Sequence, residues 1–260
     1  MNTINENRPL VSVIIPAYNA EAYIDIAVRS VLSQTVADLE VLVFDDCSGD
    51  RTAERIRQLA AEDPRVRPWF NEENIGVART RNKGLDLASG DYVALLDADD
   101  LWYPDKLEKQ IALMRSTNAD LVYSGYALVD NSGKKIKDFC APPTETLESL
   151  LTQNGIGCST VLLSRNVVDH YRFRTDYYHE DYVLWIQLLQ DGKKAVGIPQ
   201  PLVDYRVHAN SRAYNKLSSS LHRWHIYHSF LGFSALKSGW ITLKYAVMGL
   251  KKHVPGLGSK

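Results

Sequence analysis

The stretch "DYVALLDADDLWYPDKL", residues 91–107, contains an apolar run that ends abruptly in a cluster of acids. Tyr92 to Leu96 form the run, and Asp97, Asp99 and Asp100 follow it directly. A short apolar run of this kind predicts a buried strand, which places the carboxylates at its carboxyl end. Acids this close repel each other, and a fold that keeps them together usually places a cation between them. The competing interpretation is a solvated acidic turn.

Upstream of this stretch, short β-branched runs alternate with segments of helical periodicity. Strands that alternate with helices predict an α/β fold with a mostly parallel sheet and right-handed crossovers. Such sheets bind ligands beyond the carboxyl ends of their strands, where the acids at 45, 46, 97, 99 and 100 are expected. The expected strands are residues 11–16, 40–46, 66–70 and 91–97, and the expected helices are residues 20–34, 48–63 and 74–90.

The regular alternation weakens after residue 105, and a basic segment closes the chain. Here the patterns predict a hairpin that turns at residues 131–133, and finally two amphipathic helices hinged near Ser238 and Gly239. Between these lie a helix at 105–116, a strand and helix at 158–168, a helix at 180–192 and an extended segment at 196–208.

Composition is that of an ordinary globular protein, with 260 residues of which 45% are hydrophobic and 23% are charged. The formal net charge of −1 hides an asymmetry, because nine basic residues and no acid follow Asp204, so the first 204 residues carry −10. This division favours a catalytic body with a basic tail that prefers an anionic surface. A nucleic-acid partner is disfavoured, because the body is acidic and contains no recognised binding motif.

The cysteines and the termini indicate a cytoplasmic protein. Cys47, Cys140 and Cys158 are far apart and lack metal-ligand spacing, so reduced thiols are expected. The polar start "MNTINENRPL" does not predict a signal peptide, and no run approaches the length of a transmembrane helix.

Two groups of polar residues at neighbouring strand ends carry the predicted chemistry. Positions i and i+2 of an extended strand point the same way, so Asp97 and Asp99 present their carboxylates together, which suits Mg²⁺ or Mn²⁺. Asp46 ends the preceding strand, where it accepts a hydrogen bond from a base or, with Ser48, caps the next helix. Tyr18 follows the first strand, and its ring either faces a ligand or is wedged in the core.

The residues "VSVIIPAYNAEAYIDIAVRSVLSQT", "LEVLVFDDCSGDRT" and "NIGVARTRNKGLDLASGDYVALLDADDLWYPDKLEKQI" resemble the family-2 glycosyltransferases of GT-A fold. The similarity runs nearly continuously over residues 11–115 and resumes at "HEDYVLWIQLL" and "YRVHANS". It implies an inverting, metal-dependent transfer of a sugar from a nucleotide sugar, usually a UDP-sugar. Similarity to bacterial surface-polysaccharide transferases, including those of the teichuronic-acid type, further implies a glycan or lipid-linked glycan acceptor.

The resemblance also assigns roles by position. It implies that Asp99 contacts the metal, that Asp97 approaches the ribose or the sugar, and that Asp181 is the general base. The alternative for Asp181 is an acid favoured by the helix dipole. Arg206 and His208 are implied to close over the diphosphate and the metal, and the alternative for His208 is a surface histidine on the basic tail. The nucleotide-binding residues implied are Pro16, Ala17, Tyr18, Asn19, Asp46, Gly76, Arg81, Asp97 and Ala98. Thr80 stands where the family usually has Ala.

These expectations divide the chain into a catalytic domain, residues 1–211, and a basic helical tail, residues 212–260. Within the domain, residues 11–115 are expected to bind the nucleotide sugar and residues 116–211 the acceptor. Cationic helices with aromatic residues can lie in the headgroup plane of an anionic leaflet, which predicts peripheral association with the inner face of the cytoplasmic membrane. The alternative is a helical pair folded back on the catalytic domain.

Three other classes of protein share part of this pattern. A phospho-receiver signalling domain also places acids after parallel strands, but it needs only about 120 residues of a chain this long. A sugar-nucleotidyltransferase carries a Gly-rich, Arg-containing loop after its first strand, where this chain has "PAYNAEAY". A glycoside hydrolase uses two carboxylates but needs neither Asp-x-Asp nor a nucleotide pocket. Dependence on a nucleotide-sugar donor separates these classes.

Overall fold

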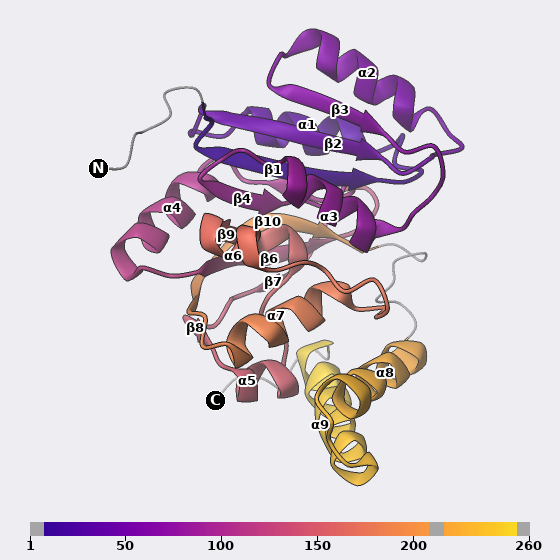
Figure 1. The fold of residues 1–260 in the computed structure, drawn as a ribbon, viewed down its shortest axis with the longest axis vertical. Coiled ribbons are helices and arrows are strands. Elements are labelled where there is room, and N and C mark those ends of the chain that lie inside the picture. The colour runs from indigo at the N-terminus through magenta and orange to yellow at the C-terminus, as the bar shows by residue number, and fades with distance from the viewer. Residues whose placement is uncertain (1–7, 208–215, 254–260) are drawn as a thin grey trace.

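One mixed sheet runs through the computed structural model, which describes residues 8–207 and 216–253, and helices cover both faces of that sheet (Figure 1). The strands are β1 (Val11–Ala17), β2 (Leu39–Asp45), β3 (Val66–Phe70), β4 (Tyr92–Leu95), β5 (Leu101–Trp102), β6 (Leu121–Val129), β7 (Lys135–Phe139), β8 (Thr144–Glu145), β9 (Leu162–Ser164) and β10 (Ala195–Arg206). The helices are α1 (Ile24–Leu32), α2 (Thr52–Glu62), α3 (Val77–Leu87), α4 (Lys106–Thr117), α5 (Leu147–Thr152), η1 (Cys158–Thr160), α6 (Arg165–His170), α7 (Glu180–Gln190), α8 (Lys216–His225), η2 (Ile226–Phe230) and α9 (Ala235–His253).

The N-terminal part of the sheet is parallel, as the alternation of strands and helices predicts. The strand order is β3-β2-β1-β4-β9-β6-β10-β5, and β1 pairs in parallel with both β2 and β4. Val11 lies opposite Leu39 on one side and Tyr92 on the other. Because these strands start in register, their carboxyl ends meet at one edge of the sheet. The antiparallel strand β9 then joins this part to β6.

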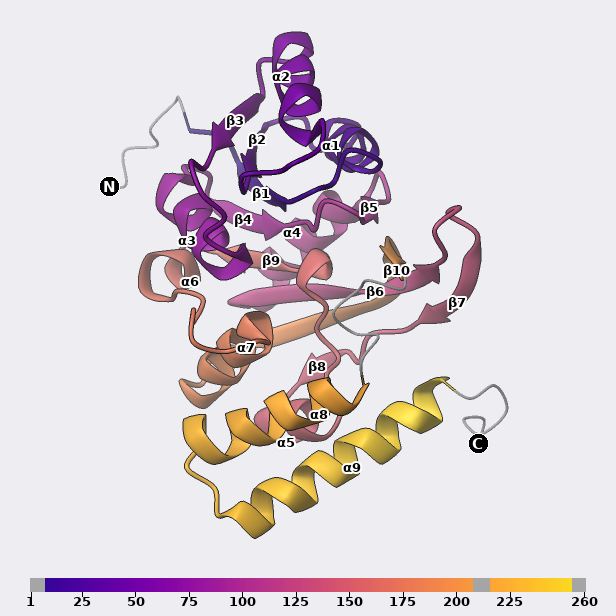
Figure 2. The same cartoon turned by 90° about the vertical axis from the view of Figure 1, so that its right-hand side faces the viewer.

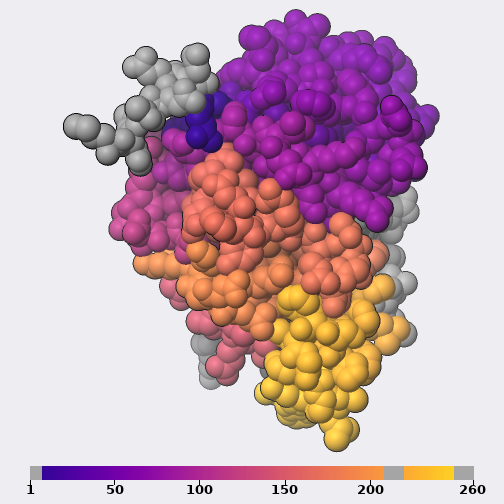
Figure 3. Space-filling model, viewed as in Figure 1, coloured from indigo at the N-terminus to yellow at the C-terminus, as the bar shows by residue number. Residues whose placement is uncertain are grey.

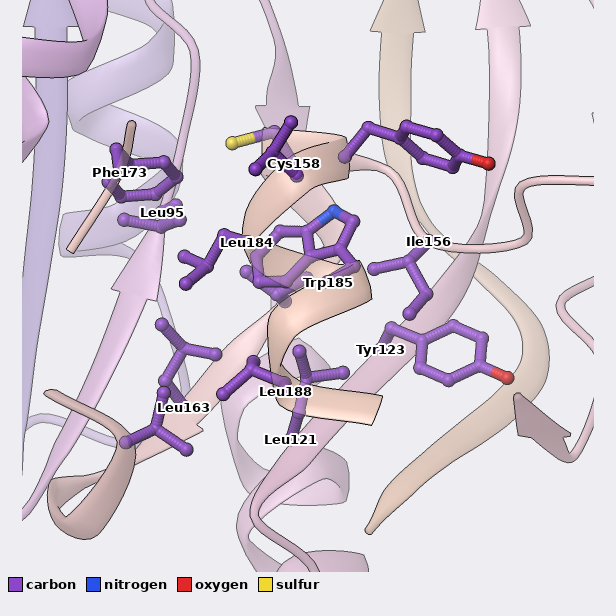
Figure 4. Close-up of a cluster of buried hydrophobic side chains, with 14 of the residues drawn as sticks. Leu95, Leu121, Tyr123, Ile156, Cys158, Leu163, Phe173, Leu184, Trp185 and Leu188 are labelled. Atoms are coloured by element: carbon purple, nitrogen blue, oxygen red, sulfur yellow. The ribbon is translucent and has the colours of Figure 1, made fainter. Parts of the chain in front are cut away.

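Alternate side chains of the central strands enter two separate cores, one on each face of the sheet. On β1, Ile14 belongs to one core, whereas Val13 and Ile15 belong to the other, as the two-residue period of a strand requires. In the first core, α7 packs Leu184, Trp185 and Leu188 against the sheet (Figure 4). Most of α7 is buried, from Tyr182 to Ile186 and at Leu188, which explains why the middle of its sequence is apolar on all sides.

The observed helices α1, α2, α3 and α7 are shorter than their sequence patterns predict, whereas α4 has the predicted length. Helix α3 begins at Val77 instead of residue 74, because Gly76 has a φ of 83°, which is outside the helical region. Its last helical residue is Leu87, since Ala88 is extended. The predicted hairpin is confirmed as β6 and β7, with the turn at Asp130–Gly133 closed by a hydrogen bond from Gly133 N to Asp130 O of 2.9 Å.

The C-terminal helices lie side by side at one end of the molecule and pack on the catalytic body (Figure 2). The predicted hinge near Ser238 and Gly239 is wrong, because both residues lie inside α9 and Ser238 is fully buried. The chain turns instead between η2 and α9, where Gly232 has a φ of 67° that residues with a side chain rarely adopt. Among the residues that the structure describes, no helix has the length and apolarity needed to span a membrane.

Candidate active site

The acids that follow β4 form a tight turn at the carboxyl edge of the sheet. Leu96 N still donates to Ile14 O on β1 at 3.1 Å, and Asp100 N donates back to Asp97 O at 3.1 Å. The Asp97 side chain is 31% exposed, Asp99 is partly exposed, and Ala98 between them is buried. The turn therefore presents the Asp97 and Asp99 carboxylates at the surface of the site.

Asp100 points into the protein and anchors this turn. Its Oδ2 lies 2.5 Å from Ser159 Oγ, and its Oδ1 accepts from Arg206 N at 2.9 Å. The same Ser159 hydroxyl accepts from Asp97 N at 3.0 Å. Burial, together with the neighbouring Asp99 and Asp97 carboxylates, raises the pKa of Asp100 well above its ordinary value. Asp100 thus fixes the position of the other two acids.

Arg81 on α3 connects the acidic turn with the start of α7. The buried guanidinium donates from Nη2 to Asp97 Oδ1 at 2.5 Å and from Nη1 to Glu180 Oε1 at 2.6 Å. It also lies over the Phe173 ring, 5.5 Å from the centroid. Burial alone would lower the pKa of Arg81, but the surrounding acids, Asp97 and Glu180 included, hold it well above its ordinary value. The guanidinium of Arg81, which stays charged, therefore links the two halves of the predicted catalytic domain through Asp97 and Glu180.

Asp181 follows Glu180 in the first turn of α7 and is partly exposed. Its Oδ1 accepts from Tyr182 N at 2.7 Å. Its neighbour in the chain, Glu180, is the acid that binds Arg81. Burial raises the pKa of the Cys158 thiol well above its ordinary value, so the thiol stays protonated and is no nucleophile.

Asp46 holds the loop that leads into α3. Its Oδ1 accepts from Asn71 Nδ2 at 2.8 Å and from Ile75 N at 3.0 Å, and its Oδ2 accepts from Gly76 N at 2.9 Å. The buried carboxylate thus uses both oxygens within the protein. Asp50, rather than Asp46, accepts from Thr52 N at the start of α2, at 3.0 Å. The predicted contact of Asp46 with a uracil stays a prediction, and its observed role is to shape the loop beside that position.

The end of β1 supplies the other predicted nucleotide-binding residues. Pro16 and Ala17 are buried in β1, whereas the Tyr18 side chain is 55% exposed and is not wedged in the core. Asn19 has a φ of 51°, and its Oδ1 accepts from Gly49 N at 2.8 Å. The structure therefore places an exposed aromatic ring and the loop after β2 at the edge of the sheet that carries the acids.

Arg206 braces the acidic turn against the β6–β7 hairpin. Its Nε donates to Asp99 O at 3.0 Å, and its Nη1 donates to Asp130 O at 2.9 Å and to Asn131 O at 3.0 Å. The guanidinium is therefore held next to the Asp99 backbone. Its predicted contact with a diphosphate stays a prediction. His208, predicted to bind the metal, lies outside the described residues.

Sequence reasoning missed three residues that organise this site. Ser159 gave no signal, because a serine in "GCSTV" matches no motif and lies 62 positions from its partner Asp97. Asn71 was overlooked because it directly follows the strand at 66–70 and matches no motif. Glu180 is next to the predicted base Asp181 in "HED". Successive helical residues point about 100° apart, so these two acids have different surroundings, but the sequence does not show which of them binds Arg81. Trp102 is a core residue whose Nε1 donates to Ser159 O at 2.8 Å.

The donor set near Asp99 suits a divalent ion shared with a substrate. Within the part of the chain that the structure describes, no group of three or more His, Cys, Asp or Glu side chains could hold a metal on its own. Mg²⁺ commonly binds through one or two carboxylates and takes its other ligands from phosphates and water. Asp99, with Asp97 beside it, therefore fits an ion that a nucleotide diphosphate helps to bind.

Two solved structures share this architecture. S. aureus TarS 1–349 in complex with UDP-GlcNAc superimposes with a TM-score of 0.69 at 18% identity, over 96% of this chain and 76% of that one. The mannosyltransferase PcManGT from Pyrobaculum calidifontis, in complex with GDP-Man and Mn²⁺, gives a TM-score of 0.68 at 19% identity, over 97% and 77% of the two chains. At these identities the likeness shows the fold, which is the predicted GT-A fold.

Sequence comparison identifies the family. TuaG of Bacillus subtilis, which is named as a teichuronic acid biosynthesis glycosyltransferase, is 36% identical to this chain. The match covers 95% of this chain and 98% of TuaG. WfgD of Escherichia coli, named as a UDP-Glc:alpha-D-GlcNAc-diphosphoundecaprenol beta-1,3-glucosyltransferase, is 38% identical over 94% of this chain and 95% of its own. The profile of Glycosyl transferase family 2 matches residues 12–165. The chain is therefore a glycosyltransferase that belongs to family 2, as the sequence resemblance predicted.

Proposed function

We propose that this enzyme transfers a sugar from a UDP-sugar to a hydroxyl of a lipid-linked glycan, with inversion at the anomeric carbon. The observation that carries the proposal is the pair of contacts made by Arg81. One joins it to Asp97 after β4 and the other to Glu180 at the start of α7. Acids suited to holding a donor and acids suited to activating an acceptor therefore face one another in a single site.

The donor lies at the carboxyl edge of the sheet in this proposal. Tyr18 and Asn19 flank the nucleoside, the Asp46-bound loop contacts the base, and Asp97 approaches the ribose or the sugar. Gly76 and Arg81 lie beside the diphosphate. The small side chain of Ala98 lets the diphosphate approach the acidic turn. Arg206 and His208 close over the diphosphate, with residues 11–115 as the donor half. Asp99, with Asp97 beside it, would hold a divalent ion, Mn²⁺ or Mg²⁺, which would supply positive charge to neutralise the leaving diphosphate.

The acceptor enters from residues 116–211, the side of Asp181. A sugar hydroxyl is a poor nucleophile at neutral pH, so its attack needs a general base within hydrogen-bond reach. Asp181 takes the hydroxyl proton as the oxygen bonds to the anomeric carbon. The bond from that carbon to the diphosphate breaks in the same step, and UDP leaves with the bonding electrons. Glu180 does not serve as the base, because Arg81 already binds its carboxylate.

The relatives guide the choice of substrates. WfgD and WfaP of Escherichia coli are both named as transferring glucose from UDP-Glc to alpha-D-GlcNAc-diphosphoundecaprenol. We therefore take UDP-glucose as the first donor and GlcNAc on a diphospho-lipid as the first acceptor for this chain. A polyprenol-linked acceptor stays in the membrane, so this proposal includes a reaction at the inner face of the cytoplasmic membrane.

The experiment that tests the donor class is calorimetric titration of UDP, with and without Mn²⁺, beside GDP, CDP and ADP. We expect UDP to bind selectively, and to bind more tightly with the metal. Asp99→Ala is the decisive variant, because the Asp99 side chain is partly exposed and its loss leaves the fold intact. The variant should lose the metal-dependent part of the UDP affinity and abolish transfer.

The Asp138→Ala variant is a matched control, since Asp138 is an exposed acid on β7 outside the site. It should bind UDP as the wild type does. Retained turnover in Asp99→Ala would remove the metal from this mechanism. Absence of nucleotide binding under every metal condition would mean that the chain has the fold without the activity.

A further inference from the structure

Helix α9 carries an apolar stripe along its outer side. Leu236, Trp240, Leu243 and Val247 are 88%, 59%, 56% and 44% exposed. Their spacing of four, three and four residues places them on one face of the helix. Large apolar side chains that line up in this way on a surface usually mark an interaction site.

The opposite side of α9 is already packed against the protein. Ser238 is fully buried, and the Tyr245 ring lies 3.7 Å from the Arg223 guanidinium of α8. Arg223 is in turn 4.2 Å from the ring of Tyr182 in α7. Since these contacts fix the rotation of α9 about its axis, the stripe must face away from the body. Helix α9 itself lies at the end of the molecule opposite α2 (Figures 2 and 3).

A row of lysines borders the stripe. Lys237 and Lys244 each follow a stripe residue by one position, so both lie along the same edge of it. The Lys244 ammonium is 5.4 Å from the Trp240 ring, so cation and aromatic ring form one surface. The chain after Asp204 contains no acid that could neutralise these cations. A partner that is both apolar and anionic would therefore complement this surface.

We propose that the outer face of α9 docks on a lipid bilayer with anionic headgroups. The stripe enters the boundary between headgroups and acyl chains, while the lysines reach the phosphates beside it. A second copy of this chain is a poorer occupant, because a twofold contact would bring two rows of lysines together without an acid between them. This inference deepens the proposed function, since a lipid-linked acceptor lies in the same bilayer.

Vesicle flotation tests the proposal without donor, acceptor or metal. Wild-type protein should float with vesicles of phosphatidylcholine and phosphatidylglycerol and should bind much less to pure phosphatidylcholine. The variant Leu236→Ser/Leu243→Ser should bind about tenfold more weakly, because two large apolar side chains no longer enter the bilayer. The control is Ile26→Ser/Ile136→Ser, which removes two exposed apolar residues from α1 and β7, away from the stripe, and should bind as wild type does.

The lysines and the alternative occupant are tested separately. Lys237→Gln/Lys244→Gln should weaken binding to anionic vesicles by about fivefold per lysine and reduce its dependence on salt. Equal flotation of the stripe variant and the wild type overturns the proposal. A wild-type protein that is dimeric in solution while the stripe variant is monomeric also overturns it, in favour of a second copy. Transfer to a short-chain, water-soluble acceptor should be unchanged in all these variants, which separates failure of docking from failure of the proposed function.

Discussion

The Nη1 atom of Arg81 lies 2.6 Å from Glu180 Oε1, although the two residues are 99 positions apart in the chain. Both side chains are buried, at 4% and 5% exposure. The same guanidinium binds Asp97, so it fixes the distance between the acidic turn and α7. A buried ion pair gives little net stability but is costly to break, because one charge is then left in a poorly solvated place. The pair therefore acts mainly as a rigid spacer between the two sets of acids.

Arg81→Met should destabilise the protein by about 3–5 kcal/mol, because the Glu180 carboxylate loses its buried partner. Urea unfolding of the variant measures the loss. Arg81→Met/Glu180→Met should recover much of that loss, since both charges are then removed together. Additive effects of the two substitutions would show that the observed contact carries no coupling energy.

Asp181→Asn should lower kcat by about 10²–10⁴-fold, because the amide cannot take the acceptor proton. UDP affinity and Tm should stay at their wild-type values, since Asp181 lies on the acceptor side and the fold does not depend on its charge. A transfer assay at saturating donor measures kcat. Asp176→Asn is the control, because Asp176 is an exposed acid close by in sequence and should be fully active. Full activity in Asp181→Asn would assign the base to another residue.

Asp46→Asn should loosen the loop at residues 71–76. The Asp46 carboxylate accepts three hydrogen bonds there. An asparagine amide has only one acceptor oxygen, so its NH₂ group would face an N–H donor of the loop and lose a hydrogen bond. Hydrogen exchange of the loop amides should speed up, and UDP should bind more weakly. Asp45→Asn is the matched control, because Asp45 is equally buried but has one oxygen without a hydrogen-bond partner. Equal exchange rates in the two variants would contradict the role assigned to Asp46.

Glu40 should make stability depend on pH in the acid range. Burial raises the pKa of Glu40, but hydrogen bonds from Ser12 and Ser89 and the ion pair with Arg67 outweigh it, and the net pKa lies below the ordinary 4.5. The stabilisation is therefore complete above the unfolded-state pKa and is lost as the pH falls through the lower folded-state pKa.

Glu40→Gln should consequently cost about 1.5–3 kcal/mol at pH 7, the usual contribution of hydrogen bonds to a charged group. The difference from wild type should shrink as Glu40 becomes protonated below pH 4.5. Urea unfolding across this range measures both values. A difference that stays constant down to pH 3 would show that the charge of Glu40 contributes nothing.

The sequence by itself determined the N-terminal, parallel part of the fold and the location of the acids. The parallel strands β1, β2 and β4 follow from β-branched runs alternating with helical periodicity, which are local properties of the chain. Asp46, Asp97 and Asp99 come directly after such strands, so their place at the carboxyl edge needed no tertiary information. The resemblance over residues 11–115 added the family, which the full-length relatives confirm.

Only the tertiary structure decided which acids become partners and where the tail turns. Ser159, Asp100 and Arg206 meet through contacts that span 59 and 106 positions, and no periodic pattern carries such information. Arg81 lies between Asp97 and Glu180 because α3 and α7 pack near the same strand ends. The tail turns at Gly232, whose positive φ follows the end of η2. It does not turn at the Ser238-Gly239 pair that the sequence suggested. Local periodicity sets the elements, and long-range packing sets the distances on which the chemistry depends.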